Sequence, residues 1–321
     1  MPPASQHDNA TLGIFFIVLG MTAITINDML IKLLSGGYPL HEMVFVRSVI
    51  GICFSLSLVQ LEGGFKILRW LHLSRGLLLV VSNLSFFAAL AVLPLADATA
   101  IFFVAPLFIT LLSILMLGEK VGFRRISAVL VGFAGVIVVQ QPWSSQEPEI
   151  ANRLVLLLPV LAAFTYALCQ ILTRRLGVSS KASAMAVYIH GTFIVVSAGF
   201  WVIAGDGRFA AGIEDPSLQF LFRAWRWPSD GDGLLFFCLG ALSGIIGYSI
   251  SQAYRSAQAA TVAPFEYVAM PLAVLWGWLA WDYLPSTPVV GGIALIMGAG
   301  LYVFLRERKR AQYAKAHTRA R

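Results

Sequence analysis

Glu266 is a carboxylate inside a long apolar stretch of the sequence, residues 259–281. At 1.5 Å of rise per residue, a helix over this stretch places Glu266 ~10 Å from its start. Pro264 and Pro271 flank it, and each proline removes a helical N–H and frees a backbone carbonyl. Such backbone is tolerated at membrane depth where it is re-satisfied or lines a wet cavity. The spacing predicts a cation or proton site at Glu266, with a protonated glutamate that only braces the helices as the alternative.

A second set of charges lies in the first two apolar stretches of the chain. Measured along helices, Asp28 and Arg47 lie ~9 Å and ~12 Å from the short connection between these stretches, so they can share one depth. Lys32 follows Asp28 at the i+4 position, which is the favourable order for an acid–base pair on a helix. Two interpretations stay open. One is a structural cluster that neutralises itself, and the other is a substrate- or proton-binding role for Asp28, Arg47 and the neighbouring Asn27.

Two uncharged polar side chains, Asn83 and His190, lie near the middle of other apolar stretches. An unperturbed imidazole titrates near neutral pH, so His190 can relay protons, or it can be a neutral packing residue. Asn83 can hydrogen-bond to a neighbouring helix or contact a substrate. Aromatic rings at similar depths can pack in the core or stack on a planar or cationic substrate. These rings are Phe86, Phe87, Phe102, Phe103, Tyr166, Tyr248, Tyr267 and Trp276, of which Phe103, Tyr166, Tyr267 and Trp276 are the predicted site residues.

Prolines interrupt several of the apolar stretches. Pro106 and Pro159 are expected, like Pro264 and Pro271, to kink helices that face the site, and we assign the four a kinking or gating role. Asp97 begins the stretch 97–117, and we expect its side chain to cap that helix.

Common catalytic motifs are absent from the sequence. The sequence holds no HExxH, GxSxG or P-loop motif, which argues against a zinc protease, a serine hydrolase and an ATP-driven pump within this chain. Its three cysteines lie far apart in the sequence, so we expect free thiols, no metal site and no cofactor. We therefore expect no enzyme activity. An integral-membrane enzyme or a non-transporting membrane subunit is the alternative.

The elements that position these residues follow from the composition. Hydrophobic residues make up 58% of the 321 residues and charged residues 12%, whereas a soluble domain carries ~25% charged residues. This excludes a soluble enzyme, a disordered chain and a disulfide-stapled secreted domain. The net charge of +7 comes from basic residues at the ends of apolar stretches, which the positive-inside rule explains better than nucleic-acid binding does.

The chain divides into ten apolar stretches, each able to form a transmembrane helix. We therefore predict an all-α integral membrane protein with ten transmembrane helices. Most Lys and Arg residues lie on one side of these helices, which places both termini and the basic tail 306–321 in the cytoplasm. The long connection 205–232 is rich in aromatic residues and is expected to lie on the membrane surface. The ten stretches are 11–34, 39–61, 74–93, 97–117, 124–141, 153–175, 181–204, 233–254, 259–281 and 287–305.

Weak internal similarity divides the chain into two halves, 11–141 and 153–305. An offset of 163 residues aligns Ala98-Thr99-Ala100 with Thr261-Val262-Ala263, and an offset of 142 aligns Lys32-Leu33-Leu34 with Arg174-Arg175-Leu176. Each half holds five stretches, and this odd number forces the second half to insert upside down. Inverted repeats are characteristic of secondary transporters, whose binding site lies near the midplane between the halves.

Several short motifs carry a family resemblance. Pro106, the run Leu117-Gly118-Glu119-Lys120 and Gly132-x-x-Gly135 resemble the EamA-type drug/metabolite transporter superfamily, most closely over residues 74–142. Asn27-Asp28, Phe45-x-Arg47-Ser48 and Leu95-Ala96-Asp97-Ala98 resemble the branch that contains S-adenosylmethionine and riboflavin uptake carriers. The resemblance implies a carrier of the bacterial inner membrane, and it leaves the substrate and the direction of transport open.

Together these features predict a secondary active transporter that moves a small organic metabolite by alternating access, coupled to protons or working by exchange. The predicted partners are a small-molecule metabolite and the lipid bilayer, with no nucleic acid. Stretches 124–141 and 287–305 lack polar residues in their middles and form either a peripheral scaffold or a dimer surface. Both a monomer and a homodimer therefore stay open.

Overall fold

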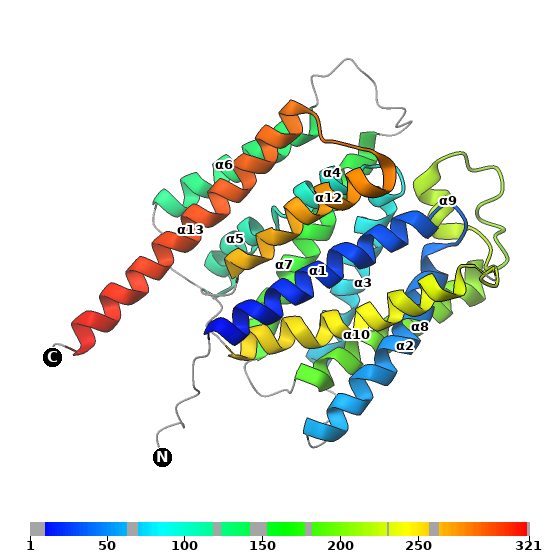
Figure 1. The fold of residues 1–321 in the computed structure, drawn as a ribbon, viewed down its shortest axis with the longest axis horizontal. Helices are drawn as coiled ribbons and strands as arrows, with labels where there is room; N and C mark the ends of the chain where they lie inside the picture. Colours follow the sequence, from blue (N-terminus) through cyan, green and yellow to red (C-terminus); the bar gives the residue numbers. More distant parts are fainter. Residues whose placement is uncertain are drawn as a thin grey trace.

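The computed structural model describes residues 10–62, 70–117, 123–141, 153–176, 182–229, 231–256 and 263–319. Within these ranges the chain is helical and contains no strand (Figure 1). The first part of the chain forms α1 (Ala10–Leu34), α2 (Leu40–Glu62), α3 (Trp70–Leu90), α4 (Leu95–Phe102), α5 (Ala105–Leu117) and α6 (Phe123–Gln140). The second part forms η1 (Arg153–Leu157), α7 (Leu158–Leu176), α8 (Ala182–Ala204), α9 (Pro216–Phe222), α10 (Gly233–Ser256), η3 (Ala263–Val268), α12 (Ala269–Trp281) and α13 (Thr287–Arg319).

Six helices are long and apolar enough to cross a membrane. Four shorter apolar helices accompany them, over Leu95–Ile109, Ile126–Gln140, Phe265–Trp281 and Thr287–Tyr302. Because a bilayer core requires about 20 apolar residues of helix, these six are the helices whose length and composition allow them to cross it. The described part of the chain is therefore all-helical, with apolar helices typical of a membrane protein, and the count of ten transmembrane helices stays a prediction. The six are Thr11–Leu34, Leu40–Gln60, His72–Leu90, Val155–Leu172, Ser183–Ala204 and Gly233–Ile250.

The four prolines stand at helix starts rather than at kinks within helices. Pro106 is the second residue of α5, which begins after a break that separates it from α4. Pro159 and Pro271 lie in the first turns of α7 and α12, and Pro264 lies in the 3-10 segment η3. The first turn of a helix has N–H groups without an intrahelical partner, so a proline there removes no helical hydrogen bond. The expected kinks are therefore breaks between two helical segments.

Helices from the two parts of the chain alternate in the bundle. Helix α1 packs against α10, α2 against α8, and α3 against α7, while α4 packs against α12 (Figure 1). The buried apolar residues form two main clusters, one around Phe87 and Phe193 and the other around Phe103 and Tyr267. The partly buried Phe102 packs against both clusters. The interior is therefore built from side chains of both halves of the sequence.

Helices α6 and α13 run together along one edge of the bundle (Figure 1). Their backbones approach closely at Gly135 and Gly292, because a Cβ atom built on Gly292 would lie 2.7 Å from the carbonyl oxygen of Gly135. Glycine at such a crossing allows helices to pack tightly in a membrane. Helix α13 continues to Arg319, so the described part of the basic tail extends the same helix.

The connection between α8 and α10 folds back onto the bundle. Asp215 caps α9 by accepting hydrogen bonds from the N–H groups of Ser217 and Leu218. Phe220 is buried in the core, and the guanidinium of Arg223 donates to backbone carbonyls of the α1–α2 connection. Much of the connection therefore packs against the protein, and its position at the membrane surface stays a prediction.

The end of this connection is fixed by a small group of hydroxyls. Tyr38 donates to the carboxylate of Asp232 over 2.7 Å, and the hydroxyl of Ser229 donates to the same oxygen over 2.7 Å. These hydrogen bonds hold the pKa of Asp232 below its ordinary value. Trp227 nearby is 96% exposed, a position that suits an aromatic ring at a membrane interface.

Candidate functional site

Arg47 of α2 is buried in the bundle among amide and aromatic side chains. Its guanidinium donates to the amide oxygens of Asn27, over 3.1 Å, and Asn83, over 2.6 Å. The rings of Phe87 and Phe193 lie 5.4 Å and 5.6 Å from its Cζ atom, within the range of a cation–π interaction. We call Arg47, Asn27 and Asn83 the Arg47 cluster. It joins α1, α2 and α3, and its partner ring Phe193 comes from α8.

The amide partners orient Arg47 without neutralising it. Asn27 uses its amide nitrogen to donate to the carbonyl of Leu239 in α10, which leaves its oxygen to accept from Arg47. Asp28 is close enough to interact electrostatically with Arg47, yet among the described residues no ion pair joins the two side chains. Because both hydrogen-bond acceptors are neutral amides rather than carboxylates, they do not neutralise the positive charge of the guanidinium.

Lys32 does not form the expected pair with Asp28. Its ammonium donates to the carbonyls of Leu90 and Leu93, over 2.6 Å each, where α3 ends. The last carbonyls of a helix lack intrahelical partners, so a lysine from a neighbouring helix can satisfy them. The i+4 spacing was a correct sign of a shared helix face, but the α3 terminus is the partner that Lys32 contacts.

His190 of α8 lies beside the Arg47 cluster. A Cβ atom built on Gly51 of α2 would lie 2.7 Å from Cε1 of His190, so the imidazole fills the space that this glycine leaves. Arg47 and His190 interact electrostatically. Nδ1 of His190 is buried and has no hydrogen-bond partner within the described part of the chain. The position fits either of the two roles expected for His190, a proton relay or a packing residue.

Glu266 lies in η3 close to two tyrosines. Its carboxylate is near enough to interact electrostatically with Tyr166 of α7 and with Tyr267. Tyr166 is hydrogen-bonded to Gln170, and the buried hydroxyl of Tyr267 has no hydrogen-bond partner among the described residues. We call Glu266, Tyr166 and Tyr267 the Glu266 cluster. It gathers the carboxylate and two of the rings that the sequence places at similar depth.

A row of aromatic rings connects the two clusters. The ring of Phe87 lies 5.4 Å from that of Phe86, and Phe86 lies 5.3 Å from Phe102. Phe102 lies 5.5 Å from Tyr166, and Phe103 lies 5.6 Å from Tyr267. Phe102 and Phe103 stand at the break between α4 and α5. The row therefore runs from Arg47 to Glu266 through the broken segment of the bundle.

Trp276 takes a different place from the other predicted rings. Its indole N–H donates to the hydroxyl of Thr25 in α1 over 3.1 Å. Trp276 packs against the core cluster that contains Phe87, whereas Phe103 and Tyr267 belong to the other one. It therefore lies toward the Arg47 side of the row. Sequence reasoning missed Phe193 and Gln170, because neither a phenylalanine nor a lone glutamine in an apolar stretch carries a signal of its own.

Comparison with known proteins shows which families and proteins this chain resembles. Residues 11–140 match the model of the EamA-like transporter family. A riboflavin transporter of Rhizobium johnstonii is 29% identical over 313 residues, which covers 96% of this chain and 95% of that protein. An S-adenosylmethionine uptake transporter of Rickettsia prowazekii is 26% identical and covers 92% of this chain and 94% of its own length.

Two further comparisons extend the likeness. The pseudopaline exporter CntI of Pseudomonas aeruginosa is 26% identical over 292 residues. A solved crystal structure with 19% sequence identity covers 94% of this chain and 98% of its own, with a TM-score of 0.62, and it shows the fold alone. The match of 11–140 and the full-length likeness to named transporters confirm the resemblance seen in the motifs. The chain is therefore similar to the EamA-like transporter family over residues 11–140 and, over nearly its whole length, to proteins named as riboflavin and S-adenosylmethionine transporters.

Proposed function

We propose that this protein is a secondary active transporter that moves a small organic metabolite across the bacterial inner membrane by alternating access. The two halves, 11–141 and 153–305, rock about a central site as inverted repeats. The observation that carries the proposal is the aromatic row with an arginine at one end and a carboxylate at the other. Both halves of the chain supply its side chains, as an alternating-access site requires.

Arg47 binds an oxygen-rich or anionic group of the substrate. Two of its five N–H donors are held by amides, and the remaining donors stay available to an acceptor. A buried guanidinium without a hydrogen-bonded carboxylate is costly, and a substrate group that accepts from it offsets that cost. The flanking amides and rings fix the orientation of the guanidinium before the substrate arrives.

Glu266 couples transport to protons or to a cationic group of the substrate. A carboxylate inside a membrane helix can be neutral in one state and ionised in another, so it can take up a proton on one side and release it on the other. Tyr166 and Tyr267 lie beside it and can donate to its ionised form. Exchange without net proton movement is the second mode that this arrangement supports.

The aromatic row suits a planar ring system. Riboflavin and S-adenosylmethionine each carry a planar nitrogen heterocycle, and rings of this kind stack on phenylalanine and tyrosine. The names of the two groups of relatives therefore agree with the chemistry of the row. We propose a planar, polar metabolite as the substrate class and treat these two compounds as the first to assay.

Uptake by proteoliposomes tests the proposal. The purified protein is reconstituted and supplied with radiolabelled riboflavin, S-adenosylmethionine and amino acids, with and without an imposed pH gradient. Arg47→Gln and Glu266→Gln should abolish or strongly reduce uptake. Their controls, Arg208→Gln and Glu214→Gln, make the same changes at exposed positions of the α8–α10 connection and should leave uptake unchanged.

Chemical analysis of the recovered solute separates a carrier from an enzyme. The proposal predicts that the solute inside the vesicles is chemically unchanged. A modified product without accumulation would favour an integral-membrane enzyme. Equal uptake by Arg47→Gln and by the parent would remove Arg47 from the site.

A further inference from the structure

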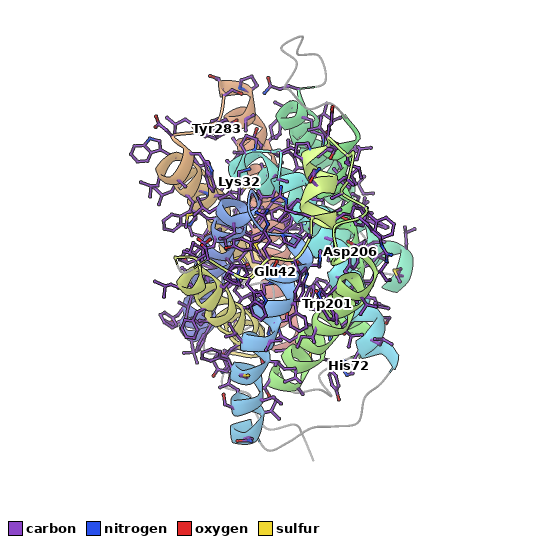
Figure 2. The ribbon with its side chains drawn as sticks, turned by 90° about the vertical axis from the view of Figure 1, so that its right-hand side faces the viewer. Lys32, Glu42, His72, Trp201, Asp206 and Tyr283 are labelled. Carbon is purple, nitrogen blue, oxygen red and sulfur yellow. The ribbon has the colours of Figure 1, made fainter. Side chains whose placement is uncertain are left out.

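A polar contact joins the two halves of the chain at the end of the bundle that holds Lys32. The hydroxyl of Tyr283 donates to the carboxylate of Asp97, with oxygen–oxygen distances of 3.2 Å and 3.4 Å. The ammonium of Lys32 lies 5.6 Å from the centre of the Trp281 ring. Figure 2 shows Lys32 and Tyr283 in the same part of the molecule. Lys32 and Asp97 belong to the first half, and Trp281 and Tyr283 belong to the second.

The backbone turn after α12 places Tyr283 against the helix bundle. Asp282 adopts a left-handed backbone conformation with φ of 51°, and its N–H donates to the carbonyl of Trp278. The N–H of Tyr283 then donates to the carbonyl of Gly277, which reverses the chain direction at the helix end. Burial and the neighbouring Asp97 carboxylate raise the pKa of Tyr283, so its hydroxyl remains a donor.

Asp97 is free to serve this contact because it does not cap its own helix. The N-cap position of α4 is Pro94, and no side chain makes a capping hydrogen bond there. The expectation that the Asp97 side chain caps this helix is therefore wrong. Its carboxylate accepts from Tyr283 and interacts electrostatically with Lys32.

Lys32 anchors the turn that carries Asp97. By donating to the carbonyls of Leu90 and Leu93, it ties the α3–α4 connection to α1. Lys32 and Asp97 are therefore held together on the first half of the chain, while Trp281 and Tyr283 stand on the second. One hydrogen bond and one cation–π contact are weak enough to break and re-form in every transport cycle.

We propose that Lys32, Asp97, Trp281 and Tyr283 form a latch that closes the Lys32 end of the transport path between the two halves. Helices α4 and α12, which the latch connects, lead directly to Phe102 and to η3 with Glu266 at their other ends. Opening the latch separates these helices and exposes the central site at this end, which the charge distribution predicts to be outside. The inference rests on the proposed transport function and adds to it the residues that close one side.

Thiol accessibility tests the latch without any substrate. A reporter cysteine, Thr25→Cys, is placed in a protein whose cysteines are replaced by alanine, because Thr25 is 2% exposed and lies toward the centre of the bundle from Lys32. The protein is held in lipid nanodiscs and treated with a charged maleimide. Tyr283→Phe and Asp97→Asn should each raise the alkylation rate, with about a tenfold increase for Tyr283→Phe, which loses a hydrogen bond to a charged acceptor.

A matched control separates the latch from a general loosening of the fold. Tyr302→Phe removes a hydroxyl from an exposed tyrosine of α13, whose partner Arg306 lies on the same helix. It should leave the alkylation rate unchanged. Unchanged rates in Tyr283→Phe and Asp97→Asn would overturn the latch, as would an equal increase in Tyr302→Phe.

A reversible cross-link provides the second arm. Asp97→Cys combined with Tyr283→Cys, in the same cysteine-free protein, is bridged by a bifunctional thiol reagent that contains a reducible disulfide. Bridging should stop counterflow in proteoliposomes, and reduction should restore it. Counterflow at the unbridged rate in the bridged protein would overturn the proposal. A protein that transports nothing but shows the expected alkylation rates would retain the latch and refute the transport function, so the two failures are distinguishable.

Discussion

Replacing Asn83 with aspartate tests whether a substrate binds to the positive charge of Arg47. In the structure the amide oxygen of Asn83 accepts from Arg47 over 2.6 Å, and Asn83→Asp puts a carboxylate oxygen in the same place. A hydrogen bond to an ionised acceptor contributes ~1.5–3 kcal/mol, against ~0.5–1.5 kcal/mol for a neutral one. The variant should therefore fold at least as well as the parent protein while its arginine is internally neutralised.

The Asn83→Asp substitution should weaken substrate binding. A substrate group that accepts from Arg47 must now compete with an internal partner that is stronger by ~1–2 kcal/mol, which corresponds to a loss of affinity of about five- to thirtyfold. Equilibrium binding of the radiolabelled solute that the parent protein takes up measures this loss, and thermal unfolding measures stability. Gln141→Glu adds the same charge at the end of α6 and serves as the control.

The opposite results would refute this account of Arg47. If Asn83→Asp binds the solute with the affinity of the parent, the substrate does not use the positive charge. If binding and thermal stability fall together, Asn83 supports the fold and the Arg47 cluster is structural.

Three further predictions follow from single contacts. Gly51→Ala should push His190 from its position and destabilise the protein by ~1–3 kcal/mol in thermal unfolding. Gly199→Ala should have little effect, because no described atom beyond its own stretch of helix lies within 4 Å of the added carbon. The hydroxyls bound to Asp232 lower its pKa, so they stabilise the α8–α10 connection at pH values above the ordinary carboxyl pKa, and this stabilisation is lost as the pH falls through that range. Hydrogen exchange of the connection should therefore accelerate on acidification in the parent protein and show less pH dependence in Asp232→Asn. A topology reporter fused after residue 310 should be active in the cytoplasm and one inserted at residue 229 outside, and activity of both on one side would contradict the ten-helix prediction.

The sequence predicts depth along a helix better than it predicts partners. A rise of 1.5 Å per residue sets how far a residue lies from its helix end, and it predicts a similar depth for Glu266, Tyr166 and Tyr267. The structure brings these three side chains close together. The same arithmetic placed Asp28 and Arg47 at a shared depth. It could not show that Arg47 turns to Asn27 and Asn83, because the choice between a carboxylate and two amides depends on side-chain directions in the packed bundle.

The remaining differences arise where tertiary contacts override local spacing. Lys32 has a suitable acid on its own helix, yet it contacts the carbonyls at the end of α3, which are distant in sequence. Pro106 and Pro271 mark the right segments, but whether a proline kinks a helix or starts one depends on the backbone before it. The aromatic residues of the α8–α10 connection predict an interfacial segment, and no local pattern reveals that one of them, Phe220, is buried in the core.

Counterflow in proteoliposomes measures alternating access most directly. Vesicles that contain the purified protein are loaded with an unlabelled solute and diluted into a trace of the same labelled solute. A carrier that exposes one site to each side in turn should accumulate label transiently above the equilibrium level, for riboflavin, S-adenosylmethionine or another planar, polar metabolite. Arg47→Gln should show no such overshoot, and Arg208→Gln should match the parent. The absence of an overshoot for every such solute in folded, reconstituted protein would contradict the account.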